Sequence, residues 1–327
     1  MAVLVTGGAG YIGSHTVAAL LERGEEVVIV DNLQQGHLQA VLGGQLYEGD
    51  LRDSGFLERV FLENEIDAVI HFAANSLVGE SMQVPGKYYH NNVYGTLCLL
   101  EKMHEHNVRR IVFSSTAATY GEPENIPIDE HDRTLPTNAY GETKLAMEKM
   151  MKWFDTAHDI KSISLRYFNA AGAHEGGKIG EDHAPETHLI PIVLQAALGQ
   201  RPHISVFGDD YDTPDGTCIR DYIHVSDLAD AHVLAVDKLR GGGDSAIYNL
   251  GNGQGFSVKE VIDIAREVTG REIPAVIEAR RAGDPATLVA SSERARRELG
   301  WNPSRNKLHD IIASAWAWHQ THPHGYT

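Results

Sequence analysis

A glycine-rich loop directly after a short apolar segment constrains this chain more than any other feature. Residues 2–6 read Ala-Val-Leu-Val-Thr, which favours a buried parallel strand, and the run Gly7-Gly-Ala-Gly-Tyr-Ile-Gly13 follows at once. Residues 14–23 then carry apolar side chains at helical spacing, and Gly24 suits the end of a helix. In such a strand-loop-helix unit, the glycines let a pyrophosphate approach the backbone at the positive end of the helix. The unit therefore predicts a dinucleotide site.

Acidic residues beyond the loop indicate which dinucleotide binds. Residues 26–30 form a second expected strand, which ends at Asp31 and Asn32. A carboxylate about 20 residues after the glycines suits the hydroxyls of the adenine ribose and repels a 2′-phosphate, so we predict NAD rather than NADP. Asp50 and Leu51 follow a third strand. Asp50 is a candidate for contact with the adenine, and a solvated loop aspartate fits the same position equally well.

Strands and helices alternate through the first half of the chain, which predicts a Rossmann-type doubly wound parallel sheet of the α/β class. Further strands are expected at 67–72, 109–114 and 162–166, and helices at 87–106 and 140–158. From about residue 170 the loops lengthen, and helices are expected at 189–198, 225–239, 257–269 and 307–319. A length of 327 residues favours two domains. We expect an NAD-binding domain at 1–170 and a smaller α+β substrate lobe at 171–327, with some segments crossing back.

Composition excludes several classes of partner. The net charge of −17 argues against nucleic acids and anionic membranes, because both require a basic surface. Two cysteines without a C-x-x-C pairing fit a reducing compartment, and the absence of a long apolar run or leader predicts a cytoplasmic protein. Histidine pairs such as His104 and His106, and the terminal histidines, lack carboxylates or cysteines at ligand spacing, so we predict no metal site.

Tyr140 and Lys144 offer acid–base chemistry on one helix. Their four-residue spacing places both side chains on the same helical face. Bringing a tyrosine pKa from about 10 to near 7 requires roughly 3 units, or about 4 kcal/mol, of preferential phenolate stabilisation. The Lys144 ammonium and a positive nicotinamide ring are the expected sources. Thr116, in the Ser-Ser-Thr that ends the strand at 109–114, could relay a substrate proton to Tyr140.

Seven segments give the chain a resemblance to the extended short-chain dehydrogenase/reductases, and within them to the branch that inverts C4 of UDP-hexoses. They are Thr6–Ser14, Val69–Ala74, Asn91–Thr96, Phe113–Thr116, Arg166–Asn169, Arg220–His224 and Gly283–Asp284. The last three lie outside the dinucleotide core, which makes the resemblance specific. It covers essentially the whole chain.

The resemblance implies interconversion of UDP-galactose and UDP-glucose through a transient 4-keto sugar and bound NADH, with Tyr140 as the phenolate base. Tyr140, Lys144 and Thr116 are the implied catalytic residues. Retention of the cofactor between turnovers is also implied. The cofactor-binding residues that it implies are Gly7, Gly10, Tyr11, Ile12, Gly13, Asp31, Asn32, Asp50, Leu51, Phe72, Ala73, Ala74, Asn91, Ser114, Tyr140, Lys144 and Tyr167.

Substrate-binding residues follow from side-chain chemistry together with position in the family pattern. The guanidinium groups of Arg220 and Arg281 suit pyrophosphate oxygens. Asp284 could accept the uridine ribose hydroxyls and Phe207 could stack on uracil, although a surface ion pair and a core position are the ordinary alternatives. The complete set is Thr116, Tyr140, Asn169, His188, Leu189, Phe207, Arg220, Arg281, Asp284 and Leu288.

The sequence departs from the family pattern at four places. Thr116 stands where serine is frequent, and His188 where asparagine is frequent. The run Phe72-Ala-Ala-Asn-Ser76 lacks a lysine that relatives carry, which puts cofactor contacts there in doubt. Leu288 replaces a bulky tyrosine that restricts some relatives to unacetylated sugars. UDP-N-acetylglucosamine and UDP-N-acetylgalactosamine are therefore candidate second substrates.

Two other functions fit the same fold. Nucleotide-sugar 4,6-dehydratases carry an Asp-Glu pair after the strand-end threonine, whereas this chain has Ala117-Ala118. Non-catalytic NAD-binding regulators lose the tyrosine and lysine that this chain keeps.

A homodimer is expected from the helices at 87–106 and 140–158, which match helices that pair the subunits of related proteins. Their apolar residues serve either an interface or the core. These residues are Val93, Leu97, Leu100, Met147, Met150 and Met151.

Overall fold

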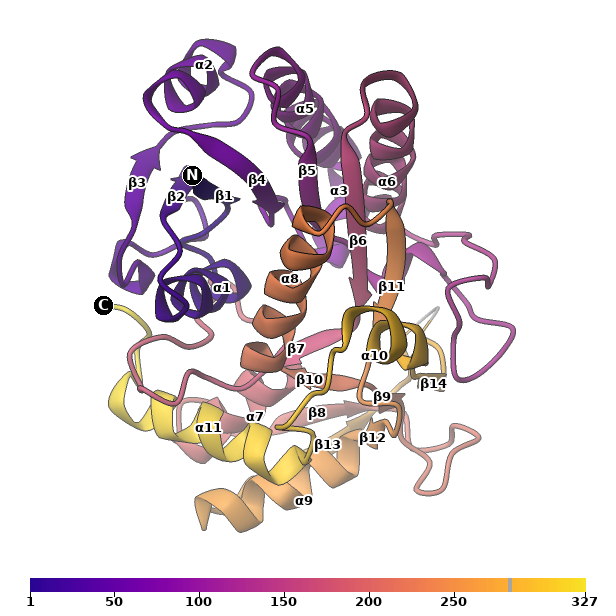
Figure 1. Cartoon of the computed structure of the whole chain (residues 1–327). Coiled ribbons are helices and arrows are strands. Elements are labelled where there is room, and N and C mark those ends of the chain that lie inside the picture. The colour runs from indigo at the N-terminus through magenta and orange to yellow at the C-terminus, as the bar shows by residue number, and fades with distance from the viewer. Residues whose placement is uncertain (282–283) are drawn as a thin grey trace.

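A seven-stranded parallel sheet with strand order β11-β6-β5-β4-β1-β2-β3 forms the centre of the computed structural model, which describes residues 1–281 and 284–327 (Figure 1). Its strands are β1 (Ala2–Thr6), β2 (Val27–Asp31), β3 (Gln45–Glu48), β4 (Ile66–His71), β5 (Arg110–Ser114), β6 (Lys161–Tyr167) and β11 (Ala246–Leu250). Strand β1 lies between β2 and β4, so the strand order reverses there. Ligands of such sheets bind in the crevice at the carboxyl ends of the strands near the reversal.

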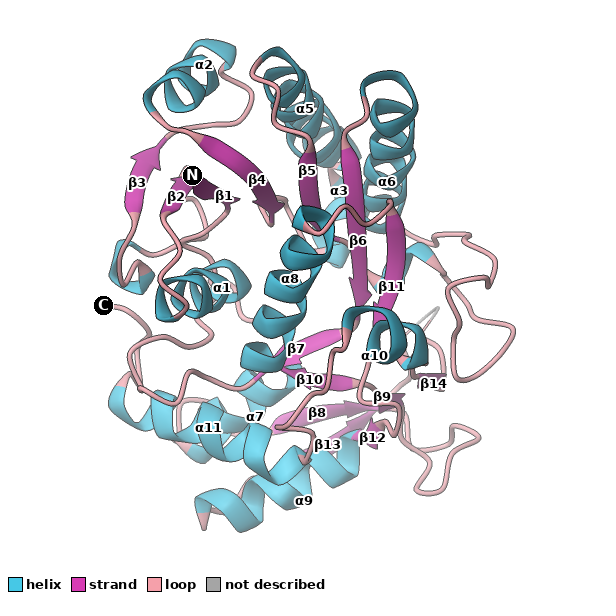
Figure 2. Ribbon diagram, in the orientation of Figure 1, coloured by secondary structure: helices cyan, strands magenta, loops and turns pink. Residues whose placement is uncertain are grey.

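Helices cover both faces of this sheet (Figure 2). One face packs against α1 (Tyr11–Glu22), α8 (Val225–Arg240) and α10 (Glu293–Leu299). The other packs against α2 (Ser54–Glu63), α5 (Gly95–Glu105) and α6 (Ala139–His158). All five residues of β1 and of β2 are buried, as expected for strands covered on both sides. The predicted doubly wound α/β fold is confirmed.

A second group of elements forms a smaller lobe below the sheet in Figure 1, with its own apolar core. Its strands are β7 (Asn169–Ala171), β8 (Ile204–Phe207), β9 (Ile219–Arg220), β10 (Tyr222–His224), β12 (Phe256–Ser257), β13 (Ala275–Glu278) and β14 (Thr287–Leu288). Its helices are α7 (Leu189–Ala197), α9 (Val258–Thr269) and α11 (Leu308–Thr321). They match the helices expected from the sequence to within two residues at each end.

Segments from the second half of the chain complete the main sheet. Strand β11 pairs in parallel with β6, and α8 packs against α1. The expected crossing of later segments into the first domain is therefore present in the structure. The chain leaves the main sheet between β6 and β7, but the division at residue 170 stays a prediction, because β11 returns to that sheet.

The helix expected at 87–106 is not continuous. The chain forms α3 (Val78–Gln83), α4 (Pro85–Tyr88), a π-helical segment η2 (Tyr89–Tyr94) and then α5. Buried Asn92, inside η2, accepts a hydrogen bond from the backbone N–H of Asn75 at 2.8 Å and donates to Thr143 of α6 at 3.1 Å. The π-helical turn is wider than an α-helical turn and directs the Asn92 amide toward both Asn75 and Thr143. A regular 3.6-residue period in the sequence does not reveal this turn.

Two short 3₁₀ segments, η1 (Leu38–Ala40) and η3 (Ala117–Thr119), complete the elements. Within the described ranges, the model holds no helix with both the length and the apolar character that crossing a lipid bilayer requires.

Candidate active site

The glycine loop closes tightly between β1 and α1. Gly7 has φ +74°, and a Cβ on it would lie 2.7 Å from the backbone nitrogen of Ala73. A Cβ on Gly13 would lie 2.1 Å from the Gly7 carbonyl oxygen. Both positions therefore require glycine for the loop to pack against the first turn of α1 and the end of β4.

Gly10 leaves the N-terminus of α1 open to an anion. A Cβ on Gly10 would meet only the Gly7 carbonyl oxygen within 4 Å, at 3.3 Å. Gly10 caps α1 without a side-chain hydrogen bond, and the first turn holds no acidic residue. The backbone N–H groups of Tyr11 and Ile12 begin this helix, so the loop offers the donors and the positive dipole end that a pyrophosphate needs.

Asp31 ends β2 close to the glycine loop. It is 7% exposed and accepts hydrogen bonds from the backbone N–H groups of Ala9 and Leu33, each at 2.9 Å. Burial raises the pKa of this carboxyl, and the two hydrogen bonds oppose that rise. Asp31 is thus positioned by the backbone, with further lone pairs for ribose hydroxyls. Asn32 lies beside it.

Asp50 is already paired within the chain. Arg52 donates from Nε to the Asp50 carboxylate at 2.8 Å, and this hydrogen bond holds the pKa of Asp50 at about 2. Asn32 is 3.5 Å from the other carboxylate oxygen. Asp50 and buried Leu51 therefore lie near Asp31. Asp50 is held in an ion pair with Arg52 and is not simply a solvated loop residue.

The acid–base residues meet at the carboxyl end of β5. Asn138 caps α6 by accepting from the Gly141 N–H, which places Tyr140 in the first turn. The Lys144 ammonium donates to the Ser114 carbonyl at 2.8 Å and lies 5.9 Å from the centre of the Tyr140 ring. Thr116 caps η3, and its hydroxyl lies near enough to the Tyr140 phenol to lower the pKa of that phenol in part. The predicted same-face arrangement is present.

Burial dominates the ionisation of both groups. It raises the pKa of Tyr140 to about 12, although the hydrogen bond with Thr116 lowers it in part. It lowers the pKa of Lys144 to about 7, against the opposing charge of Glu148. In the chain by itself, burial therefore favours the neutral phenol, and stabilisation of the phenolate by Lys144 together with a nicotinamide ring stays a prediction. Further positive charge at the site is required.

A buried ion pair between Glu148 and Arg166, which was not predicted from the sequence, lies one helical turn beyond Lys144. Glu148, one helical turn further along α6, accepts from Arg166 of β6 at 2.9 and 2.6 Å and from the Ser115 hydroxyl at 2.5 Å. The two charged side chains are 5% and 4% exposed. The sequence signal was the continued four-residue spacing of Tyr140, Lys144 and Glu148.

The remaining predicted cofactor residues surround this point. Ala73 and Ala74 follow β4 next to Gly7, and the Phe72 ring lies 4.6 Å from that of buried His232. The Ser114 and Tyr167 hydroxyls form a hydrogen bond at 2.5 Å between β5 and β6. Asn91 lies in η2 and donates to Asn92.

Predicted substrate residues of the second lobe pair with one another. Arg220 forms an ion pair with Asp284, and Leu288 of β14 pairs in register with Arg220 of β9. Asn169 of β7 donates to the Asp221 carbonyl at 2.9 Å. The two groups expected to bind pyrophosphate and ribose thus neutralise each other in the protein alone. Gly283, part of the family motif beside Asp284, lies outside the described residues.

Phe207 and Arg281 also lie together, because the Arg281 guanidinium is 3.9 Å from the centre of the Phe207 ring. His188 precedes Leu189 of α7 and contacts Glu181 and Glu186 at 3.1 and 2.9 Å. The two pairs of predicted substrate residues are joined, because the backbone N–H of Asp284 donates to the Arg281 carbonyl at 3.3 Å.

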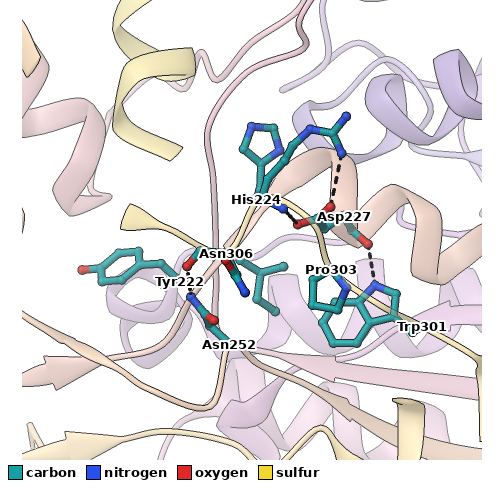
Figure 3. A pocket seen from close by; sticks show the side chains of 9 residues that line it. Tyr222, His224, Asp227, Asn252, Trp301, Pro303 and Asn306 are labelled. Atoms are coloured by element: carbon teal, nitrogen blue, oxygen red, sulfur yellow. Dashed lines mark hydrogen bonds and ion pairs between the residues drawn. The ribbon is translucent and has the colours of Figure 1, made fainter. Parts of the chain in front are cut away.

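A separate small pocket lies between β10, α8 and the segment after α10 (Figure 3). Trp301 donates its indole N–H to the Asp227 carbonyl at 2.8 Å, and the Asp227 carboxylate accepts from the Arg305 backbone at 2.8 Å. These hydrogen bonds join α8 to the segment after α10. The pocket contains none of the predicted site residues.

The glycine loop, the acidic strand end and the Tyr-Lys pair together define a nucleotide-dependent enzyme of the dehydrogenase/reductase type. The chain belongs to the NAD dependent epimerase/dehydratase family, whose model matches residues 3–251.

Individual relatives are similar along their whole length. A UDP-glucose 4-epimerase of Halalkalibacterium halodurans is 62% identical and covers 100% of this chain and 98% of its own. A crystal structure of a UDP-glucose 4-epimerase, 59% identical, has a TM-score of 0.99 over 100% of both chains. A UDP-glucose 4-epimerase from Bifidobacterium longum in complex with NAD+ and UDP is 43% identical, with a TM-score of 0.94 over 100% of both chains.

Proposed function

We propose that this chain is a UDP-glucose 4-epimerase, an isomerase that interconverts UDP-galactose and UDP-glucose with NAD as its cofactor. The observation that carries the proposal is the placement of Tyr140, Thr116 and Lys144 at the end of β5, beside the glycine loop. Full-length relatives that carry this name support it.

The residues present fit NAD. The open N-terminus of α1 at Gly10 would hold the pyrophosphate, and buried Asp31 would hold the adenine ribose and disfavour a 2′-phosphate. When bound, NAD supplies a hydride acceptor at C4 of the sugar and a positive ring. That positive charge would stabilise the Tyr140 phenolate, which burial disfavours in the chain alone.

In the proposed mechanism, Tyr140 moves one proton. Its phenolate oxygen takes the proton of the sugar 4-hydroxyl as C4 is oxidised to a ketone, and returns a proton to that oxygen as C4 is reduced from its other face. Thr116 hydrogen-bonds the same oxygen, and Lys144, anchored on Ser114, stabilises the phenolate.

Inversion requires the sugar to turn while the nucleotide stays in place. Arg220 and Arg281 would bind the pyrophosphate, Asp284 the uridine ribose and Phe207 the uracil, which separates a fixed UDP from a mobile hexose. The Arg220–Asp284 pair would exchange its mutual contact for contacts to the nucleotide. Asn169, His188 and Leu189 would line the path between uracil and sugar.

The test is NMR of purified protein mixed with UDP-galactose and no added cofactor. We expect UDP-glucose to accumulate until the two UDP-sugars reach equilibrium. No added cofactor is needed, because the bound cofactor is regenerated in each turnover. Heat-denatured protein is the control. A spectrum that stays unchanged even after NAD is added would contradict the proposal and favour a non-catalytic NAD-binding protein. The dehydratase alternative lacks its acidic pair, because buried Ala117 and half-buried Ala118 occupy that turn.

An additional activity on N-acetylated UDP-hexoses is a second proposal. Leu288 packs against Ala117, Tyr120 and Ile128, so it lies beside the turn that begins at Thr116. A leucine here leaves more room near the sugar than a tyrosine would. We expect measurable conversion of UDP-N-acetylgalactosamine by the same NMR assay, and no detectable turnover would remove this activity.

A homodimer formed through α5 and α6 is a third proposal, for a cytoplasmic enzyme. Leu100, Met147 and Met151 are at most 1% exposed and belong to the core, so they do not serve an interface. Leu97 is partly exposed, and Val93 and Met150 pack partly against the core. Trp153 of α6 is 67% exposed, and Tyr94, next to α5, is 45% exposed. Exposed aromatic residues of this kind are typical of subunit contacts.

We expect Trp153→Glu to convert the dimer to a monomer, because a carboxylate would be buried without a partner in the interface. Light scattering coupled to size-exclusion chromatography gives the mass. Leu62→Glu is the matched control, since Leu62 is 69% exposed and belongs to α2 rather than to α5 or α6. Equal masses for the two variants would refute this interface.

A further inference from the structure

Two glutamates and two histidines converge in the segment between β7 and α7, and the proposed reaction does not use them as a set. They are Glu181, His183, Glu186 and His188, and one potential ligand atom of each lies within 4.8 Å of all the others. Only His188 also belongs to the proposed substrate site. The segment lies beside the glycine loop, since the His183 ring is 6.2 Å from that of Tyr11.

The spacing of these atoms matches a tetrahedral metal site. His183 Nδ1 is 3.4 Å from Glu181 Oε1 and 3.5 Å from Glu186 Oε2. His188 Nδ1 is 3.1 Å from Glu181 Oε1 and 2.9 Å from Glu186 Oε1. Zinc bonds of about 2.0–2.1 Å in tetrahedral geometry place neighbouring donor atoms about 3.3 Å apart. The four histidine–glutamate contacts are close to this spacing.

A buried nitrogen without a hydrogen bond points into the cluster. His183 Nδ1 is shielded from solvent and has no hydrogen-bond partner, although two carboxylates lie near it. The Glu181 and Glu186 side chains are 5% and 4% exposed. In the ion pairs of the described residues, only histidines contact these two glutamates. Buried carboxylates of this kind require a cation or a proton.

A second cluster in the described part of the chain shows the contrast. Glu58, Glu105 and His106 also lie within 4.8 Å of one another. There, however, the Lys102 ammonium is 2.9 Å from Glu58 and 2.5 Å from Glu105, so a lysine already occupies the centre. This cluster has no place for a metal ion and provides a matched control.

We propose that Glu181, His183, Glu186 and His188 form a tetrahedral Zn²⁺ site. Two carboxylates balance the charge of the ion, and two imidazoles complete four-coordinate geometry with ligand types that zinc prefers. The site shares His188 with the proposed substrate site, but its test measures metal binding and does not depend on turnover.

The other titratable groups facing the cluster are Tyr11 and His319. A metal ion at the cluster would be held by deprotonated carboxylates and neutral imidazoles.

The test is titration of the full-length, metal-free protein with Zn²⁺ alone by calorimetry, and with Co²⁺ alone by visible spectroscopy. We expect one Zn²⁺ per chain and the intense absorption of tetrahedral Co²⁺. His183→Gln and Glu186→Gln should each lose this stoichiometric site. His106→Gln should retain it.

Three results would overturn the proposal: no binding by the wild type, a weak octahedral Co²⁺ spectrum, or equal binding by wild type and both cluster variants. The wild-type Co²⁺ spectrum decides the matter even if one variant fails to fold. Because neither readout requires UDP-sugar turnover, failure of this site and failure of the proposed activity are distinguishable.

Discussion

Replacing Tyr140 with phenylalanine is expected to lower kcat for UDP-galactose by about 10²- to 10⁴-fold, the contribution typical of a general acid–base group. The phenol is the acid–base group placed with Thr116 above the Lys144 ammonium, and phenylalanine fills the same space without its proton-transferring oxygen. Initial rates at saturating substrate measure the change. Binding of NAD should be retained, because the ring shape and the glycine loop are unaltered.

Tyr248→Phe is the matched control for this substitution. Tyr248 of β11 is fully buried and lies away from the glycine loop, and its hydroxyl donates to Glu298 of α10 at 3.0 Å. We expect its kcat to stay within a few-fold of the wild-type value. A Tyr140→Phe enzyme as active as Tyr248→Phe would show that another group moves the proton, and the catalytic assignment would be abandoned.

The largest effect on stability is expected from Glu148→Gln. This change leaves the Arg166 guanidinium, 4% exposed, without the carboxylate that it contacts through two nitrogens. Removing one partner of a buried ion pair costs about 3–5 kcal/mol. The free energy of unfolding, measured by urea titration, should fall by this amount. The charge that opposes the fall of the Lys144 pKa is lost at the same time.

Glu105→Gln provides the comparison. Glu105 is 51% exposed and also forms an ion pair, with Lys102, but solvent screens that pair. We expect a much smaller loss of stability there. Equal losses in the two variants would mean that the Glu148–Arg166 pair contributes nothing beyond an ordinary surface contact.

Local patterns predicted the parts of the site that lie close in sequence. The glycine loop, the strand end at Asp31 and the pair Tyr140 and Lys144 each depend on spacing within one or two elements. The structure shows them at one edge of the sheet, as expected for parallel strands. Glu148 continues the same helical face, but a lone glutamate in a helix carries no chemical signal until Arg166 is placed beside it.

Contacts between distant segments could not be predicted in this way. The pairing of Arg220 with Asp284, and of Phe207 with Arg281, joins strands β9 and β8 to residues outside any strand, and no sequence period relates these positions. The π-helical segment η2 interrupts a pattern that otherwise fits a continuous helix.

The cluster around His183 lies in a loop, where the spacing of residues does not fix their direction. Strand β11 is also one short apolar run among long loops, and only its pairing with β6 reveals its place in the main sheet. These features depend on tertiary contacts rather than on any local period.

The most direct test of the central claim follows a hydrogen atom at C4. UDP-galactose that carries deuterium at C4 is converted in ordinary water, and the product is examined by NMR and mass spectrometry. The account predicts UDP-glucose with deuterium retained at C4, because that hydrogen leaves and returns as a hydride that does not exchange with solvent. Product with hydrogen from water at C4 would contradict it.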